Sequence, residues 1–401
     1  MVEAVIVAAG RSAIGRANKG SLAAMRPDDL ASQVIRQVYD SVPELAAVTF
    51  EDLILGCGQP AGESGYNLAR VVSVLSGFNS LPGLTINRFC ASSLDSIRIA
   101  AHAIRSGDGE AFIAAGVETV SRYQFGAANT GSHNPRFAEA EARSLARKEP
   151  GRPTWQEPAG LPDIYLSMGE TAENVADIEN VTREQMDEFA ARSQQRAVEA
   201  QEIGYFENEI LPVVRPDGSV FDVDDGPRPG TTVDILSGLS PVFRSDGRVT
   251  AGNSCPLNDG AAAVVLMSDT QAARLGITPL ARIVSSAVAA VNPEIMGLGP
   301  IDACRIALAR AGLSIEDIDL IEINEAFAAQ VIPVARHLGI DHAKLNVHGG
   351  AIALGHPYGM TGARIMTTLL NGLRTSGGRL GLESMCVGGG QGVAMVVERL
   401  A

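Results

Sequence analysis

Four short blocks of the sequence carry side chains that could act together on a thioester. Cys90 precedes a run of small residues, and Cys386 precedes three successive glycines. Between them lie Asn324, in an Asn-Glu-Ala-Phe block, and His356, in a Gly-His-Pro-Tyr-Gly block. A thiol can attack a carbonyl carbon, an imidazole can accept its proton, an amide can hold an oxygen, and a second thiol can move a second proton. Each block is a weak signal alone, but the ordered set predicts acyl transfer at a carbon–carbon bond.

The sequence after Cys90 predicts a helix over 92–106, because its apolar residues recur at the helical period. Ser92 and Ser93 are residue types that commonly cap a helix N-terminus. Cys90 would then lie just ahead of the positive end of a helix dipole, which favours the thiolate and makes the sulfur nucleophilic. The local sequence is equally compatible with a buried cysteine that serves only in packing.

Two histidines compete for the role of the base. His356 is flanked by glycines and followed by Pro357, so its backbone is restricted while a substrate can approach closely. A neutral imidazole there could take the proton of Cys90. In isolation, a loop histidine such as His356 is more often a surface residue. We rank His348 second because it falls at the end of a predicted strand.

The glycines after Cys386 and the amide of Asn324 each allow two interpretations. The run Gly388–Gly390 lets backbone N–H groups converge as an oxyanion hole, or it forms a tight hairpin before a strand over 393–397. Asn324 ends a predicted strand over 320–323. Its amide either caps a following helix or holds a water against a thioester oxygen.

The composition indicates a compact globular protein and excludes several partners. Of 401 residues, 46% are hydrophobic and 19% are charged, so the chain can bury large cores. The net charge of −14 argues against a nucleic-acid partner, whose phosphates need a basic protein face. An anionic small molecule needs only a local basic pocket, so this charge does not exclude one.

The five cysteines are scattered without paired spacing, which indicates free thiols in a reducing compartment, with neither a disulfide framework nor a metal site. Residues 1–8 enter a strand-like run without a targeting pattern, and residues 398–401 are no peroxisomal signal. No apolar stretch approaches the length that spans a bilayer. We therefore expect a cytoplasmic protein that binds no membrane.

The order of predicted elements repeats along the chain. Each half places a strand, a helix, a second strand and a long helix in the same sequence. The first copy runs from residue 50 to residue 106, and the second has its strands at 315–321 and 345–348 and its long helix at 360–374. Strands that alternate with helices predict parallel βαβ units and an α/β fold.

We therefore expect two similar layered domains that meet at the active site, and one insertion. The N-terminal domain comprises residues 1–120 with 248–268, and the C-terminal domain comprises residues 269–401. Residues 121–247 form an inserted domain that is rich in loops and carries one charged helix over 182–201. Because long loop-rich excursions in compact enzymes are usually functional, we expect the insertion to cover the site.

Taken together, these blocks resemble the thiolase family, and the resemblance runs along nearly the whole chain. The Asn-Glu-Ala-Phe, Gly-His-Pro and Cys-x-Gly-Gly-Gly blocks stand in the family's order. Four further segments match the family: Ile6–Ser12, Met168–Ala176, Arg248–Asn253 and Leu257–Ala262. The resemblance implies an α-β-α-β-α sandwich of two duplicated domains. It also implies coenzyme A as a substrate, with no metal and no tightly bound cofactor.

The resemblance assigns roles to the residues already singled out. Cys90 would carry the acyl group as a thioester, with His356 accepting its proton. Cys386 would move a proton at the α-carbon of acetyl-CoA. Asn324, through a water, would bind one thioester oxygen together with His356, and the backbone N–H groups of Cys90 and Gly388 would bind the oxygen of the acyl-enzyme.

Further residues match family positions around the CoA thioester. Arg228 matches a position near the nucleotide and Ala251 one beside the pantetheine, while the pocket-lining positions are occupied by Met168, Met296 and Phe327. Cys255 stands where a serine commonly faces the pantetheine. Tyr358 stands where a smaller aliphatic residue is usual, and its bulk could reshape the acyl pocket. Residues 126–166, the expected lid, match no segment of the family.

We interpret the chain as a thiolase that exchanges 3-ketoacyl-CoA and CoA reversibly with acyl-CoA and acetyl-CoA, as in fatty-acid β-oxidation. One alternative is an enzyme dedicated to acetoacetyl-CoA, and another is a non-catalytic acyl-CoA-binding protein of the same fold. A carrier-protein condensing enzyme is disfavoured because such enzymes usually have His or Asn in place of Cys386. The family and the apolar residues Phe137, Trp155 and Tyr165 of the insertion favour a homotetramer, or failing that a homodimer.

Overall fold

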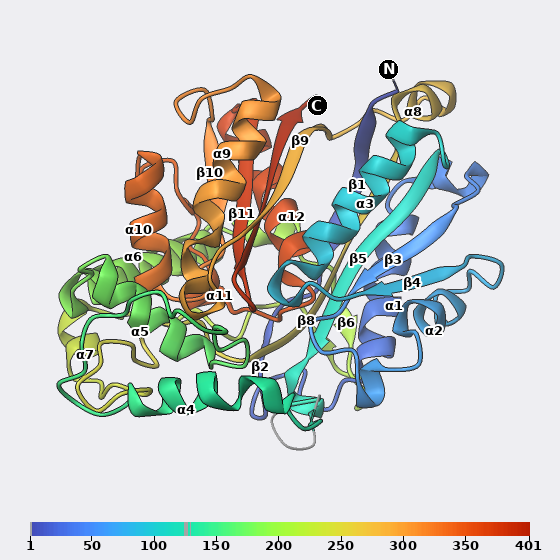
Figure 1. The fold of residues 1–401 in the computed structure, drawn as a ribbon. Coiled ribbons are helices and arrows are strands. Elements are labelled where there is room, and N and C mark those ends of the chain that lie inside the picture. Colours follow the sequence, from blue (N-terminus) through green and yellow to red (C-terminus); the bar gives the residue numbers. More distant parts are fainter. Residues whose placement is uncertain (1, 124–126, 129) are drawn as a thin grey trace.

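The computed structural model describes residues 2–123, 127–128 and 130–401 (Figure 1). Its main sheet has the strand order β10-β11-β12-β9-β1-β8-β5-β3-β4, with β2 paired to β8, and β6 pairs with β7 separately. The strands are β1 (Ala4–Arg11), β2 (Gly15–Arg16), β3 (Asp52–Gly56), β4 (Gly83–Ile86), β5 (Ala111–Thr119), β6 (Val213–Val214), β7 (Val220–Phe221), β8 (Asn258–Ser268), β9 (Ala281–Ala290), β10 (Leu320–Ile323), β11 (Leu380–Val387) and β12 (Gln391–Arg399).

Helices cover the sheet on both faces (Figure 1). They are α1 (Pro27–Asp40), α2 (Leu68–Leu75), α3 (Ser92–Ser106), α4 (Ala138–Ala146), α5 (Met168–Ile178), α6 (Arg183–Glu202), α7 (Val233–Ser237), α8 (Asp269–Leu275), α9 (Gly299–Ala311), α10 (Ala328–Leu338), α11 (Ala351–Leu354) and α12 (Thr361–Ser376). The predicted helices after Cys90 and over 182–201 are therefore confirmed, the latter starting one residue later because Thr182 is its N-cap in a capping box.

The two halves of the chain share one topology, as the sequence repeat predicts. In the first half β4, β3 and β5 are parallel and are followed by antiparallel β8 and β1. In the second half β10 and β11 are parallel and are followed by antiparallel β12 and β9. The halves join where β1 pairs with β9, through Val5 with Arg282 and Ile6 with Ala281.

The predicted strand over 345–348 is wrong. Only an isolated parallel bridge between Ile321 and Leu345 stands where β4 stands in the first half. Asn346 has φ of 46°, a left-handed conformation that ends an extended run. Its side chain accepts from the N–H of Ile323 and donates to the carbonyl of the same residue, both at 2.9 Å, so it takes the place of a ladder.

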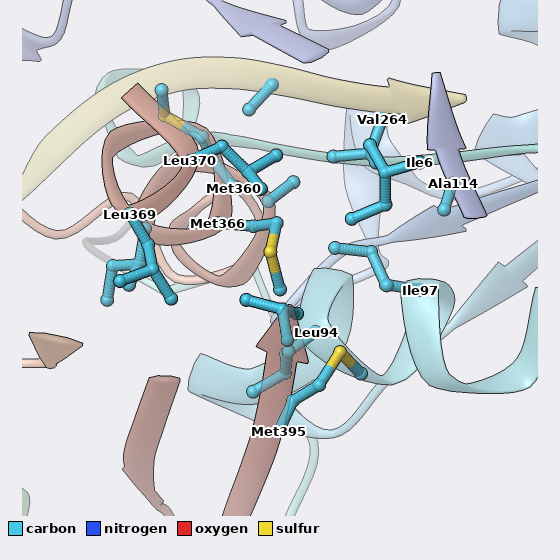
Figure 2. Packing of buried hydrophobic residues seen from close by; sticks show 14 of the residues in the cluster. Ile6, Leu94, Ile97, Ala114, Val264, Met360, Met366, Leu369, Leu370 and Met395 are labelled. Carbon is cyan, nitrogen blue, oxygen red and sulfur yellow. The ribbon is translucent and has the colours of Figure 1, made fainter. Parts of the chain in front are cut away.

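The core consists of three apolar layers, which lie between the helices and the two halves of the main sheet. Strand residues alternate between layers: Val264 of β8 faces the central layer, and Val265 faces the outer layer against α1 and α2. The central layer holds α3 and α12 between the two halves (Figure 2), with Leu94 and Ile97 of α3 near Met366 of α12. A third layer lies under α9 and α10. The predicted five-layer α-β-α-β-α arrangement follows.

The serines expected to cap α3 have other partners. Ala91 is the N-cap residue of α3, and no side chain bonds its N-terminus. The hydroxyl of Ser93 instead accepts from the N–H of Ala363 in α12 at 2.9 Å. The two central helices are thus tied together beside Cys90.

Within the described residues, the insertion (121–247) adds no strand to the main sheet, and its strands β6 and β7 pair only with each other. Trp155 donates to Glu294 at 2.7 Å, and Tyr165 stacks on His133 with ring centroids 3.8 Å apart and meets Phe137 edge-on. These three aromatic residues thus have partners within the chain, and the expected assembly stays a prediction. The domain boundaries stay a prediction, and positions 126 and 129 of the expected lid lie outside the described residues. No described helix combines the length and apolar character needed to cross a membrane.

Candidate active site

One cavity of about 560 Å³ gathers residues from both halves of the chain and from the insertion. Seven of the residues predicted from sequence line it: Cys90, Met168, Cys255, Met296, Phe327, His356 and Gly388. Asn324 reaches it from behind the imidazole of His356, as its bond to that ring shows. The sequence predicts the separate helices, strands and turns that carry these residues, and the fold brings them together at one cavity.

Cys90 lies in a single 3-10 turn, Phe89–Ala91, between β4 and α3. The hydroxyl of Ser92 holds this turn, because it accepts from the N–H of Arg88 at 2.9 Å and donates to the carbonyl of Phe89 at 2.7 Å. Phe89 has φ of 42°, which non-glycine residues rarely adopt. Strain of this kind persists only where the surroundings enforce it, and here it presents the thiol to the cavity.

The hydrogen bonds of His356 define its tautomer. Thr361 donates its hydroxyl proton to the carbonyl of Pro357 at 2.9 Å, so its oxygen accepts from Nδ1–H of His356 at 2.6 Å. Nε2 then carries the lone pair and accepts from Nδ2 of Asn324 at 3.3 Å. The N–H of His356 donates to Oδ1 of Asn258 at 3.0 Å. The ring is therefore fixed with its basic nitrogen available for a proton.

Asn324 is not a helix cap. It follows β10, and its N–H donates to the carbonyl of Ser384 at 2.9 Å. Helix α10 begins only at Ala328, with Phe327 at the N-cap position. The buried Oδ1 of Asn324 has no hydrogen-bond partner among the described residues. The amide is thus free to order a water or substrate group beside His356, which is the other interpretation of the sequence.

The glycine run forms the predicted hairpin turn, and its role as an oxyanion hole stays a prediction. Gly388–Gly390 form the turn between β11 and β12, in which Val387 pairs with Gln391. The backbone N–H of Gly388 also lies close enough to Cys90 to lower the pKa of its thiol. Cys386, at the end of β11, is fully buried just behind this turn. A hairpin therefore places one N–H donor and one thiol beside the nucleophile.

Burial keeps the site uncharged at rest. It raises the pKa of Cys90 to about 12, against the lowering effect of the Gly388 N–H. It also raises the pKa of Cys386 well above its usual value, with the neighbouring Cys90 and Cys255 adding to the shift. Burial and then the charge of Arg364 lower the pKa of His356 to about 3. Desolvation thus opposes the helix dipole that was expected to favour the Cys90 thiolate, and Cys90 needs a base at the moment of attack.

Cys255 and Tyr358, the two departures from the family pattern, both line the cavity. The N–H of Cys255 donates to the carbonyl of Ala326 at 3.0 Å, which holds this segment along the Asn-Glu-Ala-Phe block. The ring of Tyr358 meets that of His356 edge-on, with centroids 5.2 Å apart. Both side chains thus add bulk and polarity directly beside the predicted catalytic groups.

The structure does not bring every predicted residue into this cavity. Arg228 and Ala251 are exposed and lie outside its lining. Partial burial and the charge of Arg16 lower the pKa of the Arg228 guanidinium, and no ion pair to it occurs in the described part of the chain. His348, the rival base, stacks on Tyr205 with centroids 3.6 Å apart and does not line the cavity.

Sequence reasoning missed Glu118, a buried carboxylate at the end of β5. One oxygen accepts from the N–H groups of Gly58 at 2.7 Å and Gly359 at 2.8 Å. The other accepts from the N–H of Gln59 at 3.2 Å and from the hydroxyl of Tyr123. Glu118 thereby joins a cavity wall to the loop that carries the histidine. Its one sequence signal was a carboxylate within an otherwise apolar strand.

Comparisons with known proteins show the family of the chain. Residues 4–270 match the family model of the thiolase N-terminal domain, and residues 277–399 match that of the thiolase C-terminal domain. The chain is 46% identical to 3-oxoadipyl-CoA/3-oxo-5,6-dehydrosuberyl-CoA thiolase of Escherichia coli, and 43% identical to 3-ketoacyl-CoA thiolase of Bacillus subtilis. These alignments cover 100% and 99% of this chain and 100% of both relatives.

Two solved structures are similar over nearly their whole length. The dimeric peroxisomal thiolase of Saccharomyces cerevisiae has a TM-score of 0.89 and 36% identity, covering 99% of this chain and 97% of that one. The acetyl-CoA acetyltransferase of Bacillus anthracis has a TM-score of 0.84 and 39% identity, covering 100% and 99%. The chain belongs to the thiolase family.

Proposed function

We propose that this thiolase cleaves 3-ketoacyl-CoA with CoA, and runs the reverse condensation, through an acyl-enzyme on Cys90. As an acyltransferase of this family it moves acyl groups between CoA thioesters. The observation that carries the residue assignment is the convergence of Cys90, His356 and the Gly388 N–H in one cavity, with Asn324 bonded to the imidazole.

In the first step, Nε2 of His356 takes the Cys90 proton while the sulfur attacks the 3-keto carbon. The bond between C2 and C3 then breaks, and its electron pair goes to the leaving acetyl-CoA as an enolate. His356 and an Asn324-bound water hold the enolate oxygen, and Cys386 supplies the proton to C2. The acyl group stays on Cys90, with its oxygen at the N–H groups of Cys90 and Gly388.

In the second step, Cys386 takes the proton of an incoming CoA thiol, whose sulfur attacks the acyl carbon and releases acyl-CoA. Cys90 leaves with its proton returned by His356, so no proton or electron is left over. Outside the cavity, we place Arg228 at the CoA phosphates, where a guanidinium suits phosphate geometry, and Ala251 beside the pantetheine.

Mass spectrometry of intact variants after incubation with acyl-CoA tests the two thiols. Cys90→Ala should show no acyl adduct, whereas Cys386→Ala should still be acylated at Cys90 and fail to turn over, because only the first sulfur bonds to carbon. Cys304→Ala is a matched control, since Cys304 is as buried as Cys386 but lies on the core-facing side of α9. An adduct that persists in Cys90→Ala, or maps to Cys386, contradicts the assignment.

We favour a 3-ketoacyl-CoA enzyme over one dedicated to acetoacetyl-CoA, because the cavity extends past the thiols to Met168, Met296 and Phe327. Filled catalytic positions disfavour a non-catalytic binder. A role in β-oxidation, a cytoplasmic location and a homotetrameric or homodimeric assembly complete the proposal. Thiolysis rates for a series of 3-ketoacyl-CoA chains of increasing length test the substrate range.

A further inference from the structure

We propose that the acyl pocket accepts an uncharged, apolar chain and rejects a chain that ends in a carboxylate. The inference rests on the proposed function, because it names the acyl group which that reaction transfers. It separates this chain from the Escherichia coli relative whose name specifies 3-oxoadipyl-CoA, although the two are 46% identical.

The wall beyond the thiols is apolar and tightly packed. The ring of Phe243 occupies the space of a missing side chain at Gly169, where an added Cβ would lie 2.1 Å from the ring. It meets Phe327 edge-on, with centroids 6.4 Å apart. Next to the Gly388 N–H, an added Cβ would lie 3.4 Å from the Phe89 ring and 3.7 Å from the Met168 sulfur. Aromatic, thioether and aliphatic groups therefore surround the position of the acyl carbons.

No lysine or arginine lines the cavity in the described part of the chain. Two nearby guanidinium groups are already engaged. Arg88 pairs with Asp95 and donates to Oε1 of Gln391 at 2.7 Å, and Arg143 pairs with Glu294 at 2.7 Å. A carboxylate entering the pocket would meet only neutral donors.

The neutral donors are few. The Ser254 hydroxyl donates to the carbonyl of Thr250 at 2.6 Å, so its proton is not available to a ligand. Among the described polar side chains of the lining this leaves the amide of Gln59 and the phenols of Tyr165 and Tyr358, besides the imidazole of His356 and the thiols. All of these are neutral, so none supplies the charge that a buried carboxylate requires.

The pKa values of the titratable groups in the cavity are shifted in the directions that favour their neutral forms, as expected in a low-polarity environment. Burial is the main cause that raises the pKa of Cys90, Cys255 and Tyr358, all of which would be anions when deprotonated. The same burial lowers the pKa of His356. The cavity thus disfavours charge of either sign, and a substrate carboxylate would face the same penalty.

The direct test compares 3-oxohexanoyl-CoA with 3-oxoadipyl-CoA, which have equal carbon numbers and differ only in a methyl or a carboxylate end. We expect kcat/KM for the first to exceed that for the second by about 100-fold or more, because the carboxylate loses its hydration without gaining a cation. Equal values, or a preference for 3-oxoadipyl-CoA, overturn the inference.

Acetoacetyl-CoA cleavage, measured in parallel, separates this result from the proposed function. If acetoacetyl-CoA is cleaved while both longer substrates react equally well, only the pocket inference fails. If none of the three substrates is cleaved by the folded protein, the proposed function fails and the inference falls with it.

Met296→Lys, which adds a cation to the wall, gives a second test within one variant. The ratio of kcat/KM for 3-oxoadipyl-CoA to that for 3-oxohexanoyl-CoA should rise about tenfold or more, whereas Met296→Leu should leave the ratio unchanged. Because both substrates meet the same protein, any loss of folded enzyme cancels in the ratio. An unchanged ratio in Met296→Lys contradicts the proposal that the missing cation sets the preference.

Discussion

The side-chain amide of Asn324 has one hydrogen-bonded atom and one atom without a partner among the described residues. This difference predicts how its replacement changes catalysis and stability. Its Nδ2 bonds His356, while its buried Oδ1 has no partner among the described residues. Asn324→Ala should lower kcat by about a hundred- to thousandfold, because the water that donates to the developing oxyanion loses its anchor on this amide. The melting temperature should change little. Steady-state kinetics with thermal unfolding checks both.

Asn346→Ala is the matched control for this prediction. Asn346 bonds both backbone groups of Ile323 and also Glu325, so its loss leaves buried polar groups unpaired and should lower the free energy of unfolding by about 1–3 kcal/mol. If Asn324→Ala instead loses stability at normal kcat, Asn324 serves the fold and its proposed role is wrong.

At the residue scale the sequence predicts which groups can react, but not their protonation. The types and order of Cys90, Asn324, His356 and Cys386 suffice to propose acyl transfer. Burial raises the pKa of the Cys90 thiol and so opposes the expected effect of the helix dipole, and burial depends on what the insertion and the second half place over the turn. No local pattern carries that information.

At the scale of elements, Glu118 connects strand β5 to two loops that form the site. Its carboxylate accepts from Gly58, Gln59 and Gly359, and the last of these lies three residues beyond His356. Glu118→Gln turns one acceptor into a donor that faces these N–H groups. We expect the free energy of unfolding to fall by about 1–3 kcal/mol and kcat to fall more than KM for CoA changes.

Glu209→Gln provides the comparison that distinguishes positioning from stability. Glu209 is also a buried carboxylate, paired with Arg11 at 2.7 Å, but it lies outside the cavity lining. Its replacement should destabilise the fold while kcat of the folded enzyme stays near that of the parent. Equal losses of kcat in both variants would show that Glu118 acts only through stability.

Most elements could be predicted because their pattern is local. The helix after Cys90 begins and ends where its apolar period does, and the strand predicted over 320–323 is β10. The strand over 345–348 failed because the left-handed Asn346 replaces ladder bonds with side-chain bonds. Glu118 went unrecognised because its partners are far away in sequence, and only tertiary structure brings them together.

At the scale of the molecule, β4 is an edge strand of the main sheet (Figure 1). Leu84 in β4 is 43% exposed, Phe89 just after it 46%, and Tyr66 before α2 97%. Exposed strand edges with apolar neighbours are sites of pairing between subunits. We predict that two copies pair along β4, next to the Cys90 turn, within a homotetramer or a homodimer.

Light scattering after size exclusion tests the assembly. The mass should be four or two times the 41.9 kDa of the chain, and Leu84→Lys should shift it downward. Leu145→Lys, at an exposed leucine on α4 away from this edge, should leave the mass unchanged. A fully active, monodisperse species at the chain mass contradicts the predicted interface.

The pairing of β1 also has a consequence for how the protein is made. β1 spans Ala4–Arg11, yet its two neighbours in the sheet are β8 and β9, at Asn258–Ser268 and Ala281–Ala290. At ribosomal rates of about 5–20 residues per second, this apolar strand waits on the order of 10 to 50 s before either neighbour emerges. The first strand to leave the ribosome is thus among the last to be paired. Nascent chains should therefore depend on a chaperone that shields residues 4–11 until translation has passed the middle of the molecule.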